Sequence, residues 1–176
     1  MANFKEDLRK VKAFAFDIDG VFTDGTLLIH PSGEMLRSQN TRDGYAVQLA
    51  VKLGFPVAII SGGRGDSMIP RFKSLGVTDI YLGSHDKLDD FTDFCFKYDL
   101  QPDDVLYMGD DIPDICVLQK AGMATCPADA VTEVKEISRY ISDKPGGKGC
   151  VRDVIEQVLR LNGKWLNDAT KNVQSL

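Results

Sequence analysis

The sequence is poor in the residues that build metal clusters or disulfide frameworks. It has four cysteines, two histidines and one tryptophan among 176 residues, and no two cysteines form a C-x-x-C pair. A zinc site of four cysteine or histidine ligands would have to gather most of these scattered residues at one place. We therefore expect reduced and mostly buried thiols, as is usual for free cysteines.

Long apolar runs and blocks of positive charge are absent as well. No stretch approaches the ~20 apolar residues of a membrane-spanning helix, and the polar start MANFKEDLRKVK has no apolar signal region. Acidic residues number 26 against 21 basic ones, and no run of Lys and Arg is long enough to neutralise several phosphates. The sequence thus predicts a cytoplasmic protein with no membrane segment, and it disfavours nucleic acid as a partner.

What the chain does contain is a regular alternation of short apolar runs and helical patterns. The apolar runs, which predict buried strands, occupy residues 11–16, 56–60, 79–82, 105–108 and 123–126. Helical spacing covers residues 45–53, 66–75, 88–98, 115–120 and 151–161, with Gly54 and Gly76 as expected helix ends. The alternation is typical of a doubly wound α/β fold with a mainly parallel sheet. We expect one domain over residues 1–176, with a tail at about 162–176.

Residues 26–39 depart from this alternation. The segments TLLI and EMLRSQ flank the turn HPSG, in which Gly33 can supply a turn conformation. This pattern predicts a β-hairpin, called the flap below, that projects from the sheet.

Polar residues follow several of the predicted strands at the point where each strand ends. They are Asp17 and Asp19 after the first strand, Ser61, Gly62 and Gly63 after the second, Asp110 and Asp111 after the fourth, and Lys87 at the start of a helix. Because the carboxyl ends of parallel strands meet at one edge of a sheet, we expect these residues to lie together. Carboxylates, a hydroxyl, backbone N–H groups and an ammonium are the groups used in phosphoryl transfer.

Asp17 and Asp19 can take different roles, because side chains alternate in direction along an extended chain. One can attack phosphorus, while the other reaches the leaving oxygen as a general acid. An anionic nucleophile facing an anionic phosphate needs a hard cation, and Mg²⁺ with oxygen ligands, including Asp110, meets that need. Each motif alone is also explained by helix caps, turns or solvated surface charges, and it is their shared position that favours catalysis.

These residues resemble the four motifs of the haloacid dehalogenase superfamily of phosphatases. The matching segments are DIDGVFTDG at residues 17–25, the strand that ends in Ser61 and Gly62, Lys87, and GDDIPD at residues 109–114. The resemblance implies a Rossmann-like core in which Asp17 forms an aspartyl-phosphate. It also implies that Asp19 protonates the leaving alcohol and then activates water, and that Ser61 and Lys87 hold the phosphoryl oxygens.

The same resemblance implies a magnesium site. Its ligands would be Asp17, the backbone carbonyl of Asp19, and Asp110. Asp111 and Asp114 would lie next to these ligands and orient them without binding the ion.

A finer resemblance is to the 3-deoxy-D-manno-octulosonate (Kdo) 8-phosphate phosphatases, which serve lipopolysaccharide synthesis. It rests on NTRDGYAV at residues 40–47, the flap, GDDIPD, and GGKGCVRDVIEQVL at residues 146–159. It implies a phosphorylated sugar acid as substrate and assigns Asn40, Thr41, Arg42, Asp43 and Gly44, with Gly62 and Gly63, to its binding. The substrate's carboxylate calls for a cation, and the candidates are Arg42, Arg64, Arg71 and Lys148.

The motif spacing leaves no room for the cap domain that covers the site in many relatives. An open site would leave the phosphorylated aspartate in water, so we expect neighbouring subunits to cover it. The resemblance implies a homotetramer in which flaps meet and a C-terminal segment reaches a neighbour's site. An isolated two-stranded hairpin is also marginally stable, which favours an oligomer.

Two alternatives stay open. A phosphatase of 2-keto-3-deoxy nononate 9-phosphates, used in sialic-acid-type synthesis, would share the motifs, flap and tail. A phospho-aspartate receiver or a non-catalytic regulatory module would share the α/β sheet and acidic cluster. Asp19, which is suited to acid–base turnover, argues against the receiver, and the presence of the whole catalytic set argues against the module.

Overall fold

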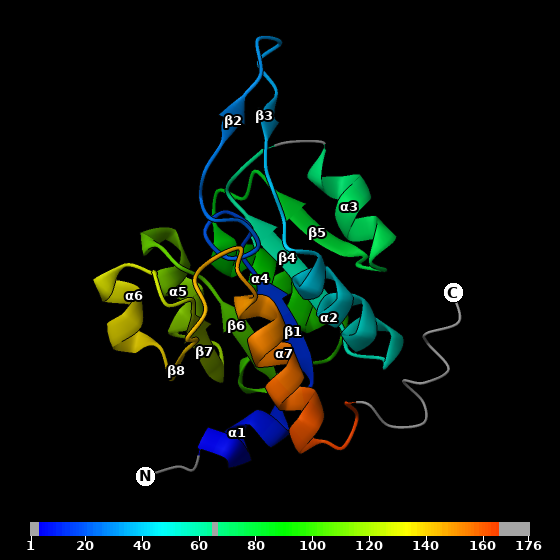
Figure 1. Cartoon of the computed structure of the whole chain (residues 1–176). Helices are drawn as coiled ribbons and strands as arrows, with labels where there is room; N and C mark the ends of the chain where they lie inside the picture. The colour runs from blue at the N-terminus through cyan, green and yellow to red at the C-terminus, as the bar shows by residue number, and fades with distance from the viewer. Residues whose placement is uncertain (1–3, 65–66, 166–176) are drawn as a thin grey trace.

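The computed structural model describes residues 4–64 and 67–165 (Figure 1). A six-stranded sheet has the order β5-β4-β1-β6-β7-β8, and every neighbouring pair is parallel. The strands are β1 (Ala13–Phe16), β4 (Val57–Ser61), β5 (Asp79–Leu82), β6 (Val105–Met108), β7 (Met123–Cys126) and β8 (Tyr140–Ile141). The predicted doubly wound fold and all five predicted strands are confirmed.

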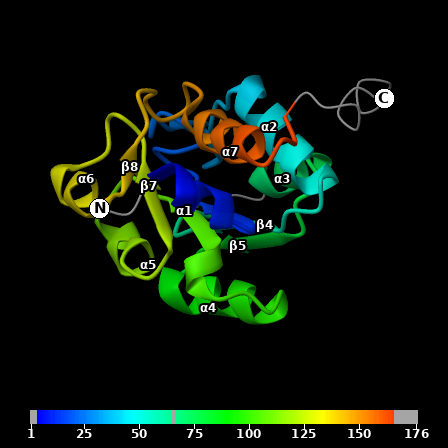
Figure 2. The ribbon, with the colours of Figure 1, turned by 90° about the horizontal axis from the view of Figure 1, so that it is seen from below.

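Helices cover both faces of the sheet, as Figure 2 shows. Alternating side chains of β1 divide the interior, with Phe14 and Phe16 in one apolar core and Ala13 and Ala15 in the other. The first core is closed by α1 (Phe4–Lys10), α2 (Thr41–Lys52), α3 (Met68–Ser74) and α7 (Cys150–Leu161). The second is closed by α4 (Lys87–Lys97), α5 (Ile115–Leu118) and α6 (Thr132–Ile137). Short 3₁₀ turns occupy Pro102–Asp104 and Ile112–Asp114. Burial on both faces explains why the strands are continuous apolar runs.

The structure shifts some predicted boundaries and adds elements. Helix α2 begins four residues earlier than predicted, because the Asn40 side chain accepts a hydrogen bond from the Arg42 N–H (2.9 Å) and caps the helix. Gly54 and Gly76 follow helix ends with φ near +85° and +87°, as predicted. The start of the predicted helix at 66–75 lies partly outside the described residues. The elements α1, α6 and β8 were not predicted, since each is too short for a clear periodic pattern.

The flap is present but shorter than predicted. Strands β2 (Leu28–Ile29) and β3 (Met35–Leu36) pair antiparallel and rise away from the sheet (Figure 1). Gly33 has a φ of +88° in the turn, and its N–H donates to the His30 carbonyl (2.8 Å). Within residues 4–64 and 67–165 there is no cap domain, as expected, and no helix long and apolar enough to cross a membrane.

Candidate active site

The predicted catalytic residues line one cavity of about 310 Å³ at the carboxyl edge of the sheet. Asp17 follows β1, Ser61 ends β4, Lys87 begins α4, and Asp110 follows β6. The other lining residues are Asp19, Gly20, Gly25, Gly62, Gly63, Asp111, Pro113 and Asp114. The convergence follows from the parallel order, in which β1 lies between β4 and β6.

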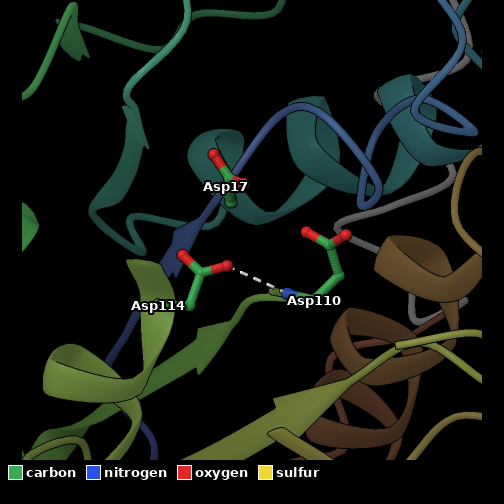
Figure 3. Close-up of side chains that lie close together, drawn as sticks. All are labelled: Asp17, Asp110 and Asp114. Carbon is green, nitrogen blue, oxygen red and sulfur yellow. Dashed lines mark hydrogen bonds between the residues drawn. The ribbon is translucent and has the colours of Figure 1, made fainter. Parts of the chain in front are cut away.

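Asp114 organises the floor of this cavity. Its fully buried carboxylate accepts hydrogen bonds from Lys87 Nζ and Tyr107 Oη on one oxygen, both at 2.7 Å. The other oxygen accepts from the backbone N–H groups of Asp110 (3.0 Å) and Asp111 (3.3 Å). Figure 3 shows the bond to Asp110. With four donors satisfied, Asp114 positions the lysine and the 110–111 loop and has little capacity left for a metal ion.

Asp17 is buried beside Lys87. The Nζ of Lys87 lies 3.1 Å from Asp17 Oδ1 and forms an ion pair with it, and no hydrogen bond of regular geometry reaches Oδ1. Burial alone would lower the pKa of Lys87, but the nearby carboxylates of Asp17 and Asp114 outweigh it and hold that pKa above its ordinary value. Lys87 is therefore a fixed positive charge next to the predicted nucleophile.

The carboxylates of the cavity are electrostatically crowded. Burial, followed by the charge of Asp114, raises the pKa of Asp17 to about 7 although Lys87 opposes the shift. Burial and the charges of Asp17, Asp114 and Asp111 raise the pKa of Asp110 to about 8. Both values mean that the ionised forms lack enough positive charge around them.

This crowding fits a divalent cation. Asp17, Asp110 and Asp114 lie close together (Figure 3), with oxygens within 4.8 Å of one another. The buried Oδ1 atoms of Asp17 and Asp110 both lack hydrogen-bonding partners. Because Asp114 is fully engaged, Asp17 and Asp110 are the residues free to bind the ion. Hard carboxylate oxygens that accept no hydrogen bond suit Mg²⁺.

Glycine is required where the loop after β1 (residues 17–25, called the catalytic loop below) meets Asp110. Gly20 has a φ of +87°, and a Cβ there would overlap the Asp110 carboxylate. The loop backbone can therefore approach the carboxylate only without a side chain.

Asp19 is held by a residue that sequence reasoning missed. Its Oδ1 accepts from Arg37 Nε (2.7 Å) and its Oδ2 from Arg37 Nη2 (3.0 Å), while Thr23 Oγ1 lies 3.5 Å from Oδ1. Arg37 follows β3 at the base of the flap. No feature of the sequence could identify this contact, because it depends on the angle at which the hairpin leaves the core.

The predicted substrate residues are spread over several places. Gly62 and Gly63 line the catalytic cavity, where the Gly63 N–H donates to Ser61 Oγ (3.2 Å). Arg64 is exposed beside a narrow gap that Asp19 and Arg37 also line. Arg71 lines none of the cavities described here, and its Nε donates to Gln39 Oε1 (3.4 Å).

Residues 40–44 have mixed surroundings. Asn40 caps α2, and Thr41 and Arg42 are exposed at its first turn. Asp43 and Gly44 are buried, and Asp43 accepts a hydrogen bond from the Arg152 N–H (2.7 Å), which ties α2 to α7.

Lys148 and Arg42 lie together along a groove of about 440 Å³ that also has Lys144, Arg152 and Arg160 in its wall. The Lys148 side chain is 64% exposed, and its Nζ lies 3.9 Å from Asp24 Oδ2. Lys148 also lines a smaller cavity of about 210 Å³ with Asp24, Ser38, Gln39, Asn40 and Gly147. Arg42 and Lys148 are thus outside the catalytic cavity but available to a longer ligand.

The glycines before Lys148 allow a close approach of two backbone segments. A Cβ at Gly146 would overlap the backbone oxygen of Gly20, and the Gly147 N–H donates to the Val21 carbonyl (2.9 Å). The approach is to the loop that follows Asp17 in the same chain. This contact braces the catalytic loop from outside.

A family model described as haloacid dehalogenase-like hydrolase matches residues 72–154. The chain is 35% identical over 154 residues to the 3-deoxy-D-manno-octulosonate 8-phosphate phosphatase of Escherichia coli strain K12, covering 88% of this chain and 82% of that relative.

Comparison with solved structures finds the same family of phosphatases. The fold matches the phosphatase of the same name from Yersinia pestis with a TM-score of 0.89 and 32% identity, over 91% of this chain and 86% of that one. The corresponding protein from Moraxella catarrhalis, in complex with magnesium, phosphate and KDO, matches with a TM-score of 0.89 and 29% identity over 97% of both chains.

Proposed function

The chain belongs to the haloacid dehalogenase-like hydrolases, and we propose that it is the phosphatase that converts Kdo 8-phosphate to Kdo and phosphate with Mg²⁺. The observation that carries the chemistry is the buried Asp17 Oδ1, which pairs with the charge of Lys87 and lies in one cavity with Asp110, Lys87 and Ser61. The names of the relatives support the substrate. Family membership leaves the receiver alternative without support.

The chain's own groups account for each step. Asp17 attacks phosphorus, and the P–O ester bond breaks as the leaving oxygen takes a proton from Asp19. Asp19 then takes a proton from a water molecule that attacks phosphorus and frees Asp17. Lys87 and Ser61 hold phosphoryl oxygens throughout, and Asp114 fixes Lys87 in place.

Asp17, Asp110 and the backbone carbonyl of Asp19 would hold Mg²⁺. When bound, the ion neutralises the crowded carboxylates and polarises the phosphoryl oxygens.

The sugar acid extends from the catalytic cavity toward Arg42 and Lys148, which supply positive charge for its carboxylate. Replacing Lys148 with Ala should raise KM for Kdo 8-phosphate far more than for an aryl phosphate. An equal rise for both substrates would contradict a role of Lys148 in reading the sugar acid.

The exposed apolar side chains of the flap support the proposal that the protein assembles into an oligomer. Leu28 and Ile29 are 68% and 70% exposed, and Leu27 and Met35 are 39% and 45% exposed. Such a group of apolar side chains favours burial against other subunits, in line with a homotetramer whose flaps meet. The proposed reach of the C-terminal tail concerns residues mostly outside the described ones. A monomer at micromolar concentration with full activity would refute this assembly.

The deciding experiment measures phosphate release with Mg²⁺ and with EDTA from Kdo 8-phosphate, a nine-carbon keto-deoxy acid 9-phosphate, arabinose 5-phosphate and 4-nitrophenyl phosphate. We expect the highest kcat/KM for Kdo 8-phosphate, and loss of activity in EDTA and in Asp17→Asn. The exposed Asp103→Asn is the matched control and should remain active.

Preference for the nine-carbon acid would keep the mechanism and change the pathway. Absence of turnover of all four compounds would refute the phosphatase assignment. Cytoplasmic location and a role in lipopolysaccharide precursor synthesis belong to the same proposal.

A further inference from the structure

Arg37 forms the most specific contact near the cavity that the proposed chemistry does not use. Its guanidinium faces both oxygens of Asp19 in a two-bond fork, at 2.7 Å and 3.0 Å. The Arg37 side chain is only 5% exposed, whereas that of Asp19 is 32% exposed. Its remaining bond runs from Nη1 to the Met35 carbonyl (3.1 Å) within the flap.

This arrangement is selective. Within residues 4–64 and 67–165, no other carboxylate lies within 4 Å of the Arg37 guanidinium. A buried arginine loses its hydration, and a hydrophobic side chain would anchor the flap equally well, so stability alone is a weak reason for an ion pair here. The two N–H donors of the Arg37 guanidinium fix the rotation of the Asp19 carboxylate, which an apolar side chain at position 37 could not do.

The position of the two residues separates their tasks. Asp19 lines the catalytic cavity, while Arg37 lies behind it and is not among the residues that line that cavity. Arg37 can therefore act on the reaction through Asp19. Thr23 adds to the restraint, since its Oγ1 accepts from the N–H groups of Gly20 (3.3 Å) and Gly25 (3.2 Å) and lies near Asp19.

Resting on the proposed function, we propose that Arg37 is a positioning residue that aims the Asp19 carboxyl group at the leaving oxygen and so ties the flap to proton transfer. A protonated Asp19 keeps one acceptor oxygen for the guanidinium while its O–H turns to the leaving oxygen. As the P–O ester bond breaks, that oxygen keeps the electron pair and takes the proton. The fork then receives the carboxylate in the orientation needed to accept a proton from water.

The test uses the dependence of the rate on the leaving group. Arabinose 5-phosphate releases an alkoxide that needs a proton, whereas 4-nitrophenyl phosphate releases a stable phenolate that does not. The value of kcat/KM reports the first phosphoryl transfer, which contains the acid step. Neither compound carries a carboxylate, so loss of carboxylate recognition cannot imitate the effect.

Arg37→Ala should lower kcat/KM for arabinose 5-phosphate by about 10- to 100-fold, less than the roughly 100- to 10,000-fold of a complete loss of general acid catalysis because Asp19 itself remains. It should change kcat/KM for the aryl phosphate less than about threefold. Arg37→Lys should fall between, because it keeps the charge but not the fork. In an Asp19→Asn background, Arg37→Ala should cost nothing further, since the two residues act as one unit.

The matched control is Arg9→Ala, which removes an exposed arginine from α1 at the other end of the sheet (Figure 1). It should leave both rates unchanged. Equal losses of Arg37→Ala on both substrates, or a further loss in the Asp19→Asn background, would overturn the positioning role while leaving the phosphatase intact. Absence of phosphate release by the unsubstituted protein would instead refute the proposed function itself.

Discussion

Replacing Asp110 with Asn in the metal-free protein should stabilise the fold increasingly as the pH rises. Burial and the charges of Asp17, Asp114 and Asp111 raise the pKa of Asp110 to about 8, from an ordinary value of 3.8. Between these two values the folded chain holds a proton that the unfolded chain has released. The free energy of unfolding therefore falls as the pH rises through this window, and the contribution of Asp110 is retained in full only below about pH 4.

The size of the effect follows from the shift. A change from 3.8 to about 8 is about four pKa units, and each unit corresponds to about 1.4 kcal/mol. An isolated group with this shift would weaken the fold by about 4 kcal/mol between about pH 5 and about pH 8.5. Asp17 shares the cavity, so the two carboxyl groups ionise together and not independently. We therefore expect the advantage of Asp110→Asn to grow by about 2 kcal/mol over this range.

Urea unfolding at several pH values in EDTA measures this directly. The exposed Asp103→Asn serves as the control for the loss of one surface carboxylate. With Mg²⁺ present, the unsubstituted protein should regain stability in proportion to ion binding, and Asp110→Asn should not. An Asp110→Asn effect that is constant across the pH range would refute the electrostatic reasoning.

Two further predictions concern the supports of the site. Gly146→Ala would place a Cβ against the backbone oxygen of Gly20, which cannot move aside as a side chain would. Thermal unfolding should show that the free energy of unfolding falls by more than about 2 kcal/mol, and kcat should fall as well. An unchanged Tm would contradict the close approach. Tyr107→Phe removes a 2.7 Å hydrogen bond to the buried Asp114. Urea unfolding should show that the free energy of unfolding falls by about 1 to 2 kcal/mol. Equal stability of the two proteins would show that the hydroxyl is not needed.

The strands and the catalytic set were predictable because their physical signals are local. Apolar runs such as residues 105–108 mark strands buried on both faces, and a parallel order brings the residues after them to one edge. Asp17, Ser61 and Asp110 reach the same cavity for this reason, and Lys87 enters it from the start of the helix after β5.

The contacts that complete the site could not be predicted from the sequence. The fork between Arg37 and Asp19 depends on how the flap leaves the core, and the bonds from Lys87 and Tyr107 to Asp114 depend on how β6 packs against α4. Short elements such as β8 carry too few residues to show a period. These features arise from tertiary geometry, which local patterns do not encode.

The bracing of the catalytic loop by Gly146 and Gly147 has a consequence for the order in which the enzyme becomes competent during synthesis. The loop after β1 leaves the ribosome well before the backbone that holds it and before helix α7, which follows that backbone directly. A nascent chain can therefore pair its central strands and still lack a fixed site. Hydrolytic activity would arise only when Gly146 and Gly147 have docked on this loop, so a chain that lacks them would be inert.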